Sequence, residues 1–162
     1  MTYKPNNFSL EELVCPHVFK THGQRAWAFF DERILETLQT IRELIGKPIT
    51  VNNWSIGGQF SQRGCRCTAC QIIKEKSAAN KSYVSAHILF RAFDFDVEGM
   101  TAQQVRDFIV KNQDKLPYPI RLEGGVNWVL IRLKVCRMWL PLVLMKLQLL
   151  LLRPLCKSVS LL

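Results

Sequence analysis

The segment Arg91 to Val97, RAFDFDV, constrains the fold of this chain more than any other feature of its sequence. Its residues alternate strictly, which is typical of a half-buried β-strand because successive side chains point to opposite faces of a sheet. The two faces carry Ala92, Asp94 and Asp96 on one side and Arg91, Phe93, Phe95 and Val97 on the other. The aromatic face needs an apolar layer packed against it.

Two segments with helical periodicity can provide this layer. In residues 31–45 apolar side chains recur every three or four positions, Asp31 can cap the first turn, and Gly46 ends the segment. Residues 101–112 begin with a capping-box sequence that starts at Thr101. Both segments are therefore expected to be helices.

Two further strands are expected at residues 48–54 and 126–131, and residues 57–70 form a loop rich in Gly, Ser, Arg and Cys. Helices and strands that follow one another in this order predict an α+β fold, with a small antiparallel sheet and flanking helices.

Charge is distributed unevenly along the 162 residues. The formal net charge is +9, but six of the 22 basic residues lie from Arg132 onward, and no acidic residue follows Glu123. Without these six, 16 basic and 13 acidic residues remain, which leaves a net charge of +3. The body of the chain has no basic stripe with interleaved aromatic residues, so we do not expect a nucleic-acid partner.

Residues 133–162 form a basic, Leu-rich tail that contains no Gly. Lys146 interrupts its apolar runs, and none reaches the roughly 18 residues of a membrane span, so we do not expect a membrane partner. Three interpretations stay open: a buried or frayed helix, a basic segment at a membrane surface, or a segment translated out of frame. The second would make the chain a membrane-associated basic protein.

The N-terminal residues lack the basic and then apolar pattern of a secretion signal. We therefore expect synthesis in the cytoplasm. We also expect a monomer.

His87 and Asp94 are the candidate metal ligands, because neutral imidazole and carboxylate both bind zinc well. His87 precedes the strand and Asp94 lies within it, so both can meet at one edge of the sheet. The spacing alone is weak evidence, since an isolated His is more often structural.

The stretch Ser85 to Asp94 resembles the motif Ser-x-His-x-x-Gly-x-Ala-x-Asp of the D-alanyl-D-alanine carboxypeptidase family of zinc peptidases. Ser85, His87, Ala92 and Asp94 match it, and the similarity extends over about residues 8 to 129. The resemblance implies a Hedgehog/DD-peptidase-like fold over residues 1–132, incomplete at its last strands. It also implies one zinc ion with His87 and Asp94 as its first two ligands.

The chain departs from this family at three positions. The third zinc ligand should be a His in a sequence like Trp-Val-His, but that position is Leu130, which cannot bind zinc. In related peptidases a catalytic carboxylate lies just before that His. Here Asn127 lies near that position, and Glu123 is the nearest acidic residue and the candidate for this role. Phe90 lies at the position where the motif has Gly, and a Gly at this position implies a tight turn.

The resemblance also implies an arginine that binds the substrate carboxylate. Arg63 and Arg66 are the candidates, since guanidinium suits bidentate carboxylate binding; solvated loop arginines are the alternative. The implied function is a zinc metallopeptidase that hydrolyses peptidoglycan stem peptides, as a D-Ala-D-Ala carboxypeptidase or an endolysin. Without a secretion signal, a cell-wall target would have to be reached by another route, such as phage-type lysis. The alternative is a non-catalytic module with this fold that binds cell-wall peptides.

The similarity and the balanced composition end together near Leu130, as a single-base frameshift would cause. Translating every reading frame from about codon 120 onward tests this hypothesis. A degenerate, non-catalytic relative is the competing explanation.

A second metal site is conceivable among the cysteines. Cys67 and Cys70 have metal-like spacing, and Cys15 and His17 could complete a structural zinc site. Reduced cysteines without a metal are the alternative.

Overall fold

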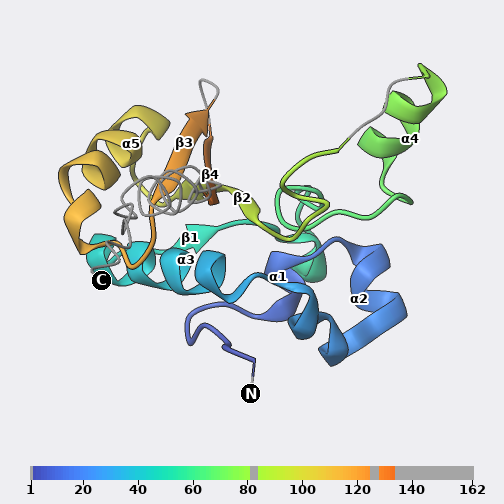
Figure 1. The fold of residues 1–162 in the computed structure, drawn as a ribbon, viewed down its shortest axis with the longest axis horizontal. Helices are drawn as coiled ribbons and strands as arrows, with labels where there is room; N and C mark the ends of the chain where they lie inside the picture. The colour runs from blue at the N-terminus through green and yellow to red at the C-terminus, as the bar shows by residue number, and fades with distance from the viewer. Residues whose placement is uncertain (1, 81–83, 125–127, 134–162) are drawn as a thin grey trace, which may run out of the picture.

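The computed structural model describes residues 2–80, 84–124 and 128–133 (Figure 1). Asn127 and residues 134–162 lie outside the described residues. The three interpretations of the tail given above concern this part of the chain. Within the described part, no helix is long and apolar enough to cross a membrane.

A small, mixed helix-and-sheet fold is observed, with an antiparallel four-stranded sheet in the order β1-β2-β4-β3. The strands are β1 (Ile49–Thr50), β2 (Ala92–Val97), β3 (Ile120–Gly124) and β4 (Val129–Leu133). The α-helices are α1 (Leu10–Leu13), α2 (Pro16–His22), α3 (Glu32–Ile45), α4 (Gln71–Ala78) and α5 (Ala102–Lys111). The 3-10 segments are η1 (Gly23–Phe29), η2 (Trp54–Ile56) and η3 (Gln113–Lys115). The α+β class and the antiparallel sheet are thereby confirmed.

Both expected helices are confirmed, and their caps are those that the sequence indicates. The Asp31 carboxylate accepts a hydrogen bond from the backbone N–H of Arg33 at the start of α3, and Gly46 ends this helix with a φ of 67°. At α5, Thr101 and Gln104 form both hydrogen bonds of a capping box.

The strand expected at residues 48–54 is much shorter than predicted. Only Ile49 and Thr50 pair with β2, because the two asparagines that follow bind a neighbouring loop instead. The Asn53 side chain and backbone both bond the backbone of Phe60, and the Asn52 amide oxygen accepts the Arg63 N–H. Polar side chains thus end the strand.

The strand expected at residues 126–131 is shifted, since β4 covers Val129–Leu133. It pairs with β2 on one side and with β3, which was not predicted, on the other. The continuous pairing shows that the sheet extends three residues past Leu130.

The two faces of the sheet differ as the alternation in β2 predicts. Phe93 and Phe95 are fully buried in the core, on the face that α3 and α5 contact. Asp94 points to the other face, which is covered by loops. Figure 1 shows α4 projecting away from the rest of the fold, next to these loops.

Candidate functional site

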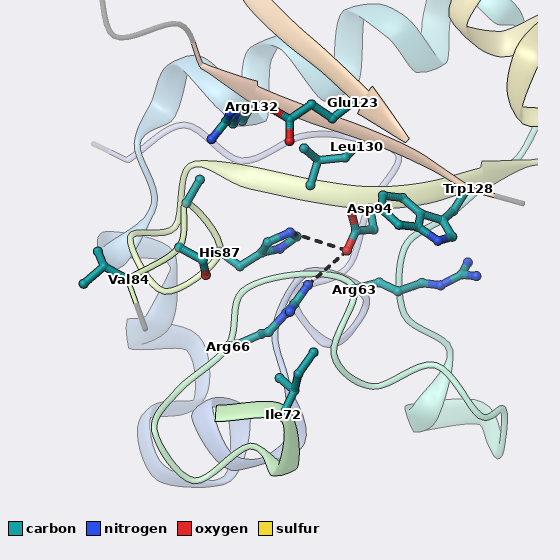
Figure 2. Close-up of a pocket in the computed structure, with 12 residues that line it drawn as sticks. Arg63, Arg66, Ile72, Val84, His87, Asp94, Glu123, Trp128, Leu130 and Arg132 are labelled. Atoms are coloured by element: carbon teal, nitrogen blue, oxygen red, sulfur yellow. Dashed lines mark hydrogen bonds and ion pairs between the residues drawn. The ribbon is translucent and has the colours of Figure 1, made fainter. Parts of the chain in front are cut away.

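A pocket of about 540 Å³ lies on the second face of the sheet (Figure 2). Strand register brings its central side chains together: Asp94 of β2 pairs with Leu130 of β4, which pairs with Glu123 of β3. Directly paired residues in an antiparallel sheet project to the same face, about 5 Å apart. Three positions distant in sequence therefore form one row, and His87 lies beside Asp94.

His87 is held in one orientation by the loop opposite it. Its side chain is buried, and its Nδ1 lies 3.0 Å from the carbonyl oxygen of Gly64. A carbonyl only accepts hydrogen bonds, so Nδ1 has the proton and Nε2 of the neutral ring has a lone pair. Burial, and then the positive charge of Arg66, lowers the pKa of His87 to about 4. The ring is therefore neutral near pH 7.

Only one of the two oxygen atoms of the Asp94 carboxylate has a hydrogen-bond partner among the described residues. Its Oδ2 accepts from Arg66 at 3.0 Å and lies 3.4 Å from Nε2 of His87, whereas its buried Oδ1 has no hydrogen-bond partner in the part of the chain that the structure describes. Burial raises the pKa of Asp94 to about 6, although Arg66 opposes this. Near pH 7 most of the population is ionised.

Nε2 of His87 and Oδ2 of Asp94 thus lie 3.4 Å apart, and both offer a lone pair when the carboxyl group is ionised. A cation bound between the two atoms would interact favourably with both lone pairs, and the unpartnered Oδ1 of Asp94 offers another ligand atom. The donor set suits zinc, which binds imidazole and carboxylate. The third member of the row is Leu130, whose side chain offers no donor, so the pair fits zinc but is incomplete.

Both candidate arginines line this pocket, and each has an acidic partner. Arg66 is buried and forms an ion pair with Asp94, but its Nε has no partner among the described residues. Arg63 forms an ion pair with Asp96 and stacks on the ring of Phe60, with 3.5 Å from guanidinium carbon to ring centroid. Neither is a freely solvated loop arginine.

Glu123 lies in the pocket as expected, but two guanidinium groups hold it. Arg121 contacts its Oε1 at 2.8 Å, and Arg132 contacts the same oxygen. Two guanidinium groups on one carboxylate oxygen fix the position of the Glu123 side chain. Arg132 was missed by sequence reasoning, because its role depends on strand register.

Phe90 has the backbone conformation that the motif reserves for glycine. Its φ of 55° lies in the left-handed region, which L-residues with a Cβ rarely adopt. Its N–H donates to the carbonyl of His87 at 3.3 Å, so the strained residue closes the turn that positions His87. Its ring packs edge-on against Phe29 and Phe30.

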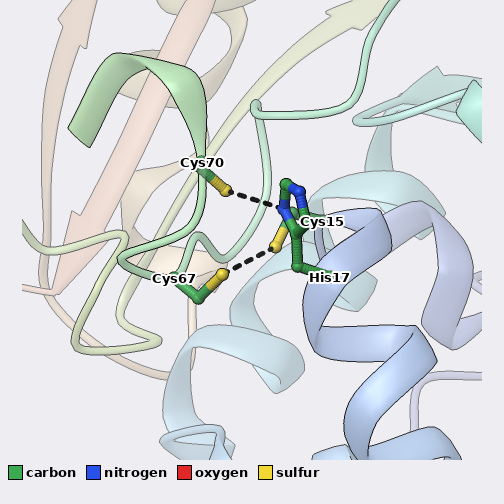
Figure 3. A group of neighbouring side chains, drawn as sticks. All are labelled: Cys15, His17, Cys67 and Cys70. Atoms are coloured by element: carbon green, nitrogen blue, oxygen red, sulfur yellow. Dashed lines mark hydrogen bonds between the residues drawn. The ribbon is translucent and has the colours of Figure 1, made fainter. Parts of the chain in front are cut away.

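The other predicted group, Cys15, His17, Cys67 and Cys70, is also brought together (Figure 3). One ligand atom from each residue lies within 4.8 Å of all the others. Hydrogen bonds from neighbouring groups, that from Cys70 first, lower the pKa of Cys15 to about 5, against the effect of burial. This group could bind a metal ion.

No family model, no curated protein and no solved structure matches this chain. The geometry of the pocket and of the cysteine group is therefore the basis for any functional assignment.

Proposed function

We propose that this chain is a zinc-peptidase-type domain for peptidoglycan stem peptides, related to D-Ala-D-Ala carboxypeptidases, whose catalytic site lacks one metal ligand. The supporting observation is the row Asp94, Leu130 and Glu123 with His87 beside it. Strand pairing puts the position expected for the third ligand directly next to the second.

In this proposal His87 and Asp94 hold zinc, and Arg63 and Arg66 bind the terminal carboxylate of the peptide. Zinc in such a site supplies Lewis acidity toward the scissile carbonyl and acidifies water. The carbonyl oxygen of Gly64 accepts a hydrogen bond from Nδ1–H of His87 and so keeps Nε2 available. With Leu130 at the third position, we expect weak zinc binding and little or no hydrolysis.

The test restores the missing ligand. Leu130→His should increase zinc affinity by about tenfold or more and should produce zinc-dependent release of D-alanine from a peptide ending in D-Ala-D-Ala. Leu130→Asn is the matched control, because it is polar and of similar size but is a poor zinc ligand. Zinc content and D-alanine release are measured for all three proteins.

Equal zinc affinity for folded Leu130→His and Leu130→Asn would refute the proposed ligand arrangement. If zinc binds more tightly but no D-alanine is released, the metal site stands and the assignment as a peptidase is wrong.

A non-catalytic wall-peptide module is the second candidate, favoured by Leu130 and by the two arginines that hold Glu123. It predicts that a D-Ala-D-Ala peptide binds the unmodified chain, whereas the same peptide with a C-terminal amide binds about tenfold or more weakly, because charge-assisted hydrogen bonds are lost. Calorimetry measures both affinities. Equal affinities would argue against carboxylate recognition by Arg63 and Arg66.

A further inference from the structure

We infer that Cys15, His17, Cys67 and Cys70 form a closed structural zinc site, separate from the pocket, which joins the start of α2 to the loop before α4. Cys15 caps α2 and His17 lies in its first turn, whereas Cys70 caps α4 and Cys67 precedes it. The site thus connects segments about 50 residues apart in sequence, as Figure 3 shows.

Two of the distances within the group match those of a tetrahedral metal site, and all four ligand atoms lie within 4.8 Å of one another. The sulfur atoms of Cys15 and Cys67 lie 3.8 Å apart, and the sulfur of Cys70 lies 3.7 Å from Nδ1 of His17. In a tetrahedral site with Zn–S bonds of about 2.3 Å, neighbouring sulfurs are about 3.8 Å apart. A disulfide would need about 2.05 Å, and these cysteines are free.

The ligand types select the metal and the role. Three thiolates and one imidazole are typical of structural zinc, and four protein ligands leave no position for a substrate. Cys65 is completely buried in the same loop but is not part of the group. It therefore provides an internal control.

The site would fix the loop that faces the pocket. Next to it, the N–H of Cys15 donates to the carbonyl of Cys65, and the N–H of Cys65 donates to the carbonyl of Leu13. Arg66, the partner of Asp94, lies between Cys65 and Cys67. Zinc bound at this point would hold Arg66 in its position.

The experiment uses the reduced full chain with Cys136→Ser and Cys156→Ser, so that the thiols outside the described residues do not contribute. Titration with Co²⁺ should give thiolate-to-cobalt charge-transfer absorption and tetrahedral d–d bands at about one ion per chain, and zinc should abolish both. The His87 and Asp94 pair contains no sulfur and cannot give this charge-transfer band. The two candidate sites are therefore distinguished.

Cys67→Ser should weaken cobalt affinity by more than about 100-fold, whereas Cys65→Ala should leave it within about threefold. If Cys67→Ser does not fold, His17→Cys tests the same site, because it should keep the stoichiometry and move the d–d bands to those of a four-sulfur site. The inference is wrong if the folded chain gives no thiolate-to-cobalt band. It is also wrong if His17→Cys leaves the bands unmoved, or if Cys65→Ala costs as much affinity as Cys67→Ser.

Discussion

Replacing Phe90 by glycine and by alanine measures the strain in the turn that positions His87. The ring centroid of Phe90 lies 5.6 Å from that of Phe29 and 5.2 Å from that of Phe30. Each aromatic pair stabilises a fold by about 0.5–1.5 kcal/mol, so losing both costs about 1–3 kcal/mol. Both substitutions incur this loss.

The two variants differ in the free-energy cost of the backbone conformation at residue 90. A Cβ in the left-handed region costs about 1–2 kcal/mol, and this cost stays in Phe90→Ala but disappears in Phe90→Gly. Glycine loses about 0.5–1 kcal/mol more conformational entropy on folding, which offsets part of the gain. From the midpoints of these two ranges we expect Phe90→Gly to be more stable than Phe90→Ala by about 0.75 kcal/mol.

Urea unfolding followed by tryptophan fluorescence gives the two free energies of unfolding, provided that the m-values agree. Leu89 supplies the control, because it is exposed and is not among the described positive-φ residues. There alanine should be the more stable of the two substitutions. Equal or greater stability of Phe90→Ala relative to Phe90→Gly would refute the strain in this turn.

Three further predictions concern Gly64 in the loop beside the pocket and the N-terminal caps of α3 and α5. Gly64→Ala should lower the free energy of unfolding by at least about 1–3 kcal/mol, measured by urea unfolding, because its Cβ would overlap the carbonyl oxygen of Leu13. Hydrogen bonds from Arg33 lower the pKa of Asp31, so its stabilisation is complete above its ordinary pKa and is lost as pH falls through the lower folded-state pKa. Asp31→Asn should therefore cost stability at pH 7 and less near pH 3, as urea midpoints at both pH values would show. Thr101→Ala should lower the unfolding free energy by about 1 kcal/mol through the lost α5 cap, without changing zinc binding.

The sequence predicted best those parts that depend on near neighbours. The helices α3 and α5 and the strand β2 follow from periodicity and from caps within a few residues, and the structure confirms all three. The short β1 was not foreseen, because Asn52 and Asn53 bond a loop that lies farther along the chain. The strand β3 has a weak alternating pattern and is stabilised by pairing with β4.

The same distinction applies to the candidate sites. His87 and Asp94 are seven residues apart in sequence, so a loop and a strand suffice to bring them together. The ion pair between Glu123 and Arg132 depends on the register of two strands, which no local pattern fixes. At the cysteine group the sequence indicated all four residues, and the fold shows that Cys15 and His17, at the start of α2, lie beside Cys67 and Cys70.

One loop, residues 63–70, contributes to both candidate sites and should therefore couple them. From this loop Gly64 and Arg66 bind His87 and Asp94, and the next residues supply Cys67 and Cys70 to the cysteine group. Loss of metal from the cysteine group should therefore loosen Arg66 and weaken peptide binding in the pocket. Leu130 belongs to the sheet and not to this loop, so Leu130→His should leave the thiolate-to-cobalt spectrum unchanged. Because coupling between two binding equilibria is reciprocal, peptide bound in the pocket should in turn strengthen metal binding at the cysteine group by the same factor.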